Sequence, residues 1–164
     1  MSSLLRAARH RHSLSRVLRF ACTGLLATLS AAAYARSNDV LPTADMVAQL
    51  EQQASRAHPR EQVFLYTQLV HAMTQQAGRE IADGETGQAA STLQQINRYT
   101  HLIHLSLTRD AKRLKDAQEM IHNTTYRLTE VLHLVSGDDR TAVQETLKQL
   151  DQLNEELLTQ VFTH

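Results

Sequence analysis

The sequence predicts an all-α protein: an antiparallel helical bundle with one long central helix over about 88–135 and a point near 108–110 where that helix could kink. Three observations favour this fold class. Apolar residues recur at spacings of three and four, no segment alternates as a strand would, and most of the few glycines and prolines after residue 35 stand between regular segments.

The first two helices are predicted from their caps and apolar faces. Thr43 is placed to cap the first helix, and Pro59 suits the first turn of the second because its missing N–H costs nothing there. Gly84 ends the second helix, and Thr86 is expected to cap the next. The two apolar faces consist of Met46, Val47, Leu50, Ala54 and Ala57, and of Val63, Tyr66, Leu69, Val70, Met73, Ala77 and Ile81.

The central helix is predicted because no glycine or proline occurs from Gln88 to Val135 and a heptad runs through that stretch. Its positions are Leu93, Ile96, Thr100, Ile103, Leu107, Asp110, Leu114, Ala117, Ile121, Thr124, Leu128, Val131 and Val135. A buried carboxylate at Asp110 would be costly, so either the stripe is open there or the helix kinks. The turn 136–139 precedes a final helix over 138–162.

Helix lengths suggest how these segments assemble. An unbroken central helix would be about 70 Å long, and each neighbour, 60–83 or 138–162, would cover half of it. A second subunit, as in a homodimer, or another protein would then complete the core; the alternative is a break near 108–110 and a closed monomer. The predicted seam comprises Leu114, Ile121, Leu128, Leu150, Asn154 and Leu157, where Asn154 either specifies register or lies at a solvated edge.

Residues 1–35 have the order of a cleaved Sec-type signal peptide. Five arginines and no acid precede an apolar run over 20–33, and Ala33 and Ala35 supply the small residues before a cut at Arg36. The run is shorter than the roughly 20 residues of a membrane span, which disfavours an uncleaved anchor. It is not amphipathic, which disfavours a mitochondrial transit peptide. We therefore expect a periplasmic or secreted bacterial protein with a short flexible lead over 36–42 and one helical domain over 43–164.

The exported chain would be acidic and free of cysteine. Cleavage leaves 129 residues with 12 basic and 17 acidic side chains, a net charge of −5, and removes the only cysteine. This balance disfavours nucleic acid and anionic membrane surfaces as partners. Without a disulfide, the core alone must hold the fold together.

No residue pattern predicts catalysis. Glu119 with His122 and Glu130 with His133 match the Glu-x-x-His spacing of di-metal bundles, but they lie about 16 Å apart on one helix and opposite its apolar stripe. His101 and His104 lack a third metal ligand. Met46 lies on an apolar face without a clear histidine partner for haem. We therefore predict no metal or cofactor site and no enzymatic activity.

Two resemblances add to this interpretation. Residues 84–93 (GETGQAASTL) resemble the turn and second helix of a tetratricopeptide hairpin, without a second copy or the aromatic, Gly and Pro positions of that repeat. Residues 60–71, 111–115 and 147–162 resemble an uncharacterised family of small exported helical proteins of soil bacteria, which implies localisation and no activity. We thus expect a non-enzymatic protein that acts by protein–protein contacts as an adaptor, chaperone-like or structural envelope protein; a metal- or haem-binding bundle is the alternative.

Overall fold

The computed structural model describes residues 42–107 and 111–163, and within them every regular element is a helix. The five helices are α3 (Ala44–Arg56), α4 (Pro59–Ala82), α5 (Thr86–Ser106), α6 (Leu114–Leu132) and α7 (Gly137–Phe162). The all-α prediction is confirmed. The predicted signal peptide, its cut at Ala33, Ala35 and Arg36, and all of the predicted lead except Pro42 lie outside the described residues.

Local chemistry explains most helix ends. The Thr43 hydroxyl accepts a hydrogen bond from Met46 N at 3.3 Å, as predicted for a cap. Pro59 occupies the first turn of α4. Gly84, with φ +77°, makes the turn from α4 into α5 in a conformation that L side chains rarely adopt. Thr86 is the first residue of α5 rather than its cap, which is Glu85.

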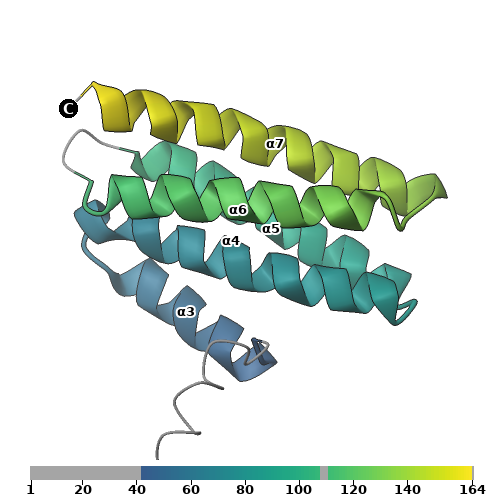
Figure 1. Cartoon of the computed structure of the whole chain (residues 1–164). Coiled ribbons are helices and arrows are strands. Elements are labelled where there is room, and N and C mark those ends of the chain that lie inside the picture. The colour runs from purple at the N-terminus through teal and green to yellow at the C-terminus, as the bar shows by residue number, and fades with distance from the viewer. Residues whose placement is uncertain (1–41, 108–110, 164) are drawn as a thin grey trace, which may run out of the picture. The chain divides into compact units, whose positions relative to one another are not determined.

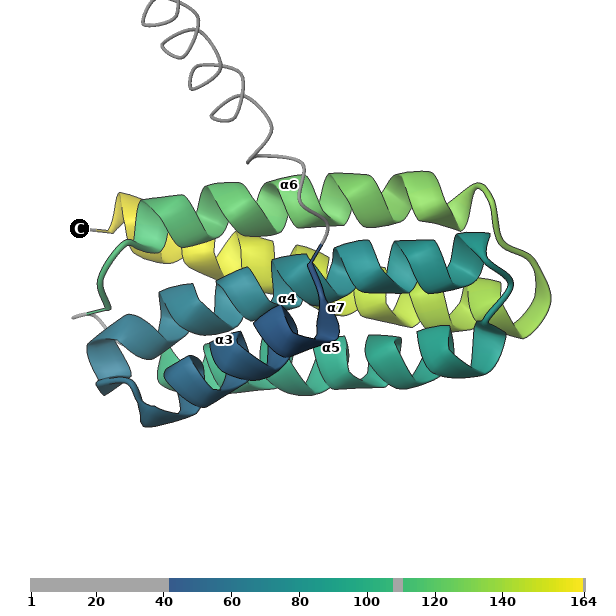
Figure 2. The same cartoon turned by 90° about the horizontal axis from the view of Figure 1, so that it is seen from below.

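Four helices form the core of the bundle. α4 and α5 form one antiparallel hairpin and α6 and α7 another, while α4 runs parallel to α6 and α5 parallel to α7 (Figures 1 and 2). Among the described helices, α4 does not pack on α7 and α5 does not pack on α6, so these are the diagonal pairs. Each helix contributes a fully buried residue to the common core, such as Leu69, Ile96, Ile121 and Leu150.

The predicted continuous helix over 88–135 is wrong. α5 ends at Ser106, where Leu107 takes an extended backbone conformation, and α6 starts only at Leu114. Just before α6 the chain is anchored on α4, because Lys112 N donates to the carbonyl of Arg60 at 2.7 Å. The position agrees with the alternative of a break near 108–110. Residues 108–110, including Asp110, lie outside the described part of the chain.

Arg113 completes this connection with a left-handed backbone (φ 59°). Its guanidinium lies 3.5 Å from the centroid of the Phe64 ring and its Nε donates to the Asp116 carboxylate at 2.7 Å. Lys112 adds an ion pair with Glu61 at 2.9 Å. These contacts hold the start of α6 beside the start of α4 and account for the parallel packing of the two helices.

α3 is an outer helix (Figure 2). Among the described helices, α4 is the one against which it packs extensively. Ala54 is its fully buried residue. Two polar contacts anchor it: the Tyr99 hydroxyl of α5 donates to the Glu51 carboxylate at 2.5 Å, and Arg79 Nη2 donates to the carbonyl of Pro42 at 2.6 Å. Burial, reinforced by the hydrogen bond to Glu51, raises the pKa of Tyr99 to about 12, so this hydroxyl stays a donor at all physiological pH values.

Candidate binding cleft between α5 and α7

The predicted seam lies inside the chain. Ile121, Leu128, Leu150 and Leu157 are fully buried between α6, α7 and the other core helices, and Leu114 packs against the edge of that core. Asn154 is partly buried and accepts a hydrogen bond from Gln118 Nε2 of α6 at 3.2 Å. In this fold, then, the seam joins two helices of one molecule and offers little surface to a partner.

The two Glu-x-x-His pairs face solvent, as helical phase predicted. Glu119, His122 and Glu130 of α6 and its C-cap His133 are all exposed. Within the described residues, no group of three or more His, Cys, Asp or Glu side chains is arranged to hold a metal ion. No helix in this part of the chain is long and apolar enough to cross a membrane.

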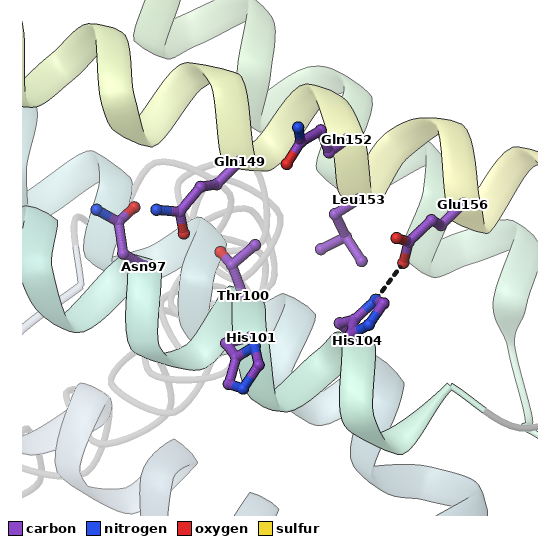
Figure 3. Close-up of a pocket in the computed structure, with 8 residues that line it drawn as sticks. All are labelled: Asn97, Thr100, His101, His104, Gln149, Gln152, Leu153 and Glu156. Atoms are coloured by element: carbon purple, nitrogen blue, oxygen red, sulfur yellow. Dashed lines mark hydrogen bonds and ion pairs between the residues drawn. The ribbon is translucent and has the colours of Figure 1, made fainter.

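A cleft of about 600 Å³ lies between the parallel helices α5 and α7 (Figure 3). Hydrogen-bonding groups without a permanent charge dominate its wall, with one apolar and one acidic side chain. The lining residues are Asn97, Thr100, His101 and His104 from α5, and Gln149, Gln152, Leu153 and Glu156 from α7. The lining residues of each helix recur three or four positions apart, so they share one face of that helix. This face lies next to the buried stripe of the same helix.

Two features of the cleft bear on what it can bind. The Asn97 and Gln149 amides face one another across it (Figure 3), yet Asn97 Oδ1 is buried and has no hydrogen-bond partner in the described part of the chain. Farther along, His104 Nδ1 and Glu156 Oε2 pair at 2.6 Å, and the His101 and His104 rings lie nearly parallel with centroids 6.2 Å apart. The cleft therefore combines an unsatisfied acceptor with groups that can both donate and accept hydrogen bonds.

A second, more apolar groove of about 380 Å³ lies beside α3. Its wall includes Met46, Leu50 and Met120, and the half-buried His71 of α4 lies at its edge. His71 Nε2 lies 2.9 Å from Gln75 Nε2, which can only donate, so Nδ1 carries the proton and donates to the Thr124 hydroxyl at 2.8 Å. Both ring nitrogens are thus occupied, so His71 does not present a ligand atom to Met46 for a shared haem.

Sequence reasoning did not single out His71 or the α5–α7 cleft. His71 follows the buried Val70 on α4, whose described neighbours α3, α5 and α6 cover most of its circumference. The available signal in the sequence was that α4 is apolar on several sides, which indicates a helix that is covered by several neighbours. The cleft depends on the pairing of α5 with α7, which no local pattern specifies.

Comparisons with protein-family models, with curated proteins and with solved structures gave no match to this chain.

Proposed function

We propose that this protein is a non-enzymatic, exported helical bundle that acts by binding another polypeptide in the α5–α7 cleft. The observation that carries the proposal is the buried Asn97 Oδ1, which has no partner among the described residues and belongs to a wall that the Gln149 and Gln152 amides also line. A buried acceptor without a partner costs about 1–3 kcal/mol, and a bound donor would recover that cost once the Asn97 amide turns toward the cleft.

A polypeptide backbone fits these groups by chemistry. Side-chain amides donate and accept in the same way as peptide groups, so they can pair with an extended segment whatever its side chains are. The volume of about 600 Å³ lies within the range of ordinary ligand pockets, and Leu153 supplies an apolar floor. The proposal thus assigns the cleft to a short extended segment rather than to a folded surface.

Export rests on the basic start, the apolar run and Ala33 and Ala35 before Arg36. The test is intact-mass analysis of protein from the envelope fraction, and the expected product begins at Arg36 or within a few residues of it. Recovery of the uncut precursor from the cytosol would overturn this part of the proposal.

Binding is tested by placing a photoreactive amino acid at Gln149, which lines the cleft, and at the adjacent exposed Lys148, which does not. Irradiation in the native envelope should yield an adduct from position 149 that is weak or missing from position 148 and is reduced by Asn97→Leu. The captured protein is then identified and its binding reconstituted with purified components. Equal adducts from both positions, or none, would contradict the proposed site.

The purified protein also distinguishes the proposed function from the alternative of a metal- or haem-binding bundle. Elemental analysis and a visible absorption spectrum should give no stoichiometric metal and no haem band. Either signal, retained through a chelator wash, would favour the alternative.

A further inference from the structure

A second hollow adjoins the α5–α7 cleft at the His104–Glu156 pair. This hollow, of about 310 Å³, is lined by His104, Leu107, Glu156, Thr159 and Gln160, so it shares the two members of that pair with the cleft. From Asn97 on α5 to its C-cap Leu107 the two hollows span ten residue steps, or about 15 Å, which matches four to five residues of an extended chain. The His104–Glu156 pair lies where the two hollows meet, and Figure 3 shows it at the end of the cleft away from Asn97.

The interaction between His104 and Glu156 is weak enough to be displaced by another cation. The side chains of His104 and Glu156 are 55% and 40% exposed, and ion pairs this open to water are weak. In addition, the His104 imidazole carries a positive charge only when it is protonated, whereas lysine and arginine are charged at all physiological pH values. An incoming permanent cation can therefore displace His104 from Glu156 at little cost.

The charge of the groove formed by the two hollows determines which kind of polypeptide segment it can bind. Among the residues lining the two hollows, Glu156 carries the one permanent charge, and the others are amides, hydroxyls, histidines and leucines. We propose, resting on the proposed function, that the bound polypeptide is an extended segment with a lysine or arginine whose cation replaces His104 on Glu156, while the Asn97, Gln149 and Gln152 amides pair with its backbone. An acidic side chain at that position would meet Glu156 as a like charge.

The test is affinity selection of a randomised heptapeptide library on the immobilised protein, with bound and input pools sequenced. We expect lysine and arginine to be enriched at one library position. The preference should disappear in Glu156→Gln and persist in Glu155→Gln, the matched control at an exposed neighbour that does not line the groove. His104→Ala removes the competing imidazole and should tighten binding of a selected peptide by up to about fivefold.

The outcomes separate the two proposals. Enriched sequences with no preference for a basic residue, or a preference that survives Glu156→Gln, would overturn the inference and leave the binding cleft intact. A library with no enriched sequence on the wild-type protein would count against both. Circular dichroism of each variant guards against misfolding, which is not expected because His104, Glu155 and Glu156 lie outside the core.

Discussion

Three neighbouring residues of α6 illustrate how sharply burial changes along one helix. Ile121 is fully buried, whereas Glu119 two positions before it and His122 directly after it are exposed. The difference follows from the 100° step of the helix, which turns each successive side chain to another face. The same chemical change at these positions should therefore have very different effects on stability.

Ile121→Ala is expected to lower the free energy of unfolding by about 2–5 kcal/mol, because it removes apolar contact and leaves a void. Ile121→Asp should be worse, since it buries an unpaired charge. The combined control His122→Ala/His133→Ala should change stability by less than about 0.5 kcal/mol. Urea denaturation measures all three, and equal effects at 121 and 122 would contradict the assigned phase of α6.

His71 makes the stability of the bundle depend on pH. Burial, with the charge of Arg127 as a second cause, lowers the pKa of His71 below its ordinary value. The unfolded chain therefore binds the proton more readily than the folded one. The stability contribution is complete above the unfolded-state pKa, about 6.5, and is lost as pH falls from there through the folded-state pKa.

We expect wild type to lose more stability than His71→Gln between pH 7.5 and pH 5. Glutamine keeps a polar group beside Thr124 and Gln75 but cannot take a proton. Urea midpoints at both pH values give the comparison, and the difference between the two proteins cancels contributions from the exposed histidines. Identical losses in both proteins would refute this role of His71.

The break between α5 and α6 is the element that the sequence left open, as the alternative to a continuous helix over 88–135. The apolar spacing of three and four continues on both sides of it, and Ile103, Ala117, Ile121 and Leu128 are all buried as the heptad predicted. The heptad thus predicted which residues are buried, although the helix that carries them is not continuous. No glycine or proline lies between the two helices, and the left-handed position just before α6, which glycine would usually fill, is held by Arg113.

Arg113 offers a test of how this connection is held. Arg113→Ala keeps the left-handed backbone strain and loses the contacts with Phe64 and Asp116, whereas Arg113→Gly loses the same contacts and relieves the strain. The glycine variant should be more stable than the alanine variant by about 1 kcal/mol. Thermal or urea denaturation measures the gap. Equal stability would show that the left-handed conformation imposes no strain.

At the scale of the whole molecule, the break changes the argument for self-association. The mismatch in helix lengths called for a second subunit only if 88–135 were one helix. Folded back as α5 and α6, the two halves of the stripe complete a four-helix core within one chain. Partner binding then becomes a matter of surface clefts rather than of a missing half of the core.

The melting temperature should therefore be independent of protein concentration over a hundredfold range, because folding is not coupled to association. Sedimentation over the same range should give the mass of one chain. A melting temperature that rises with concentration would restore the coupled dimer. The fully buried Ile121 and Leu128 would then need a different arrangement from the one described.

What the sequence by itself determined is whatever depends on near neighbours along the chain. Helical phase placed Ile121 inside and Glu119 and His122 outside, and local chemistry placed the Thr43 cap and Pro59 in the first turn of α4. Only the tertiary structure decided where the long stripe folds back, that α4 runs beside α6 and α5 beside α7, and hence that Asn97 meets Gln149 and His104 meets Glu156. Those pairs lie 52 residues apart, and no local spacing encodes them, because they arise from anchoring contacts such as Lys112 on Arg60 that form only once the helices pack.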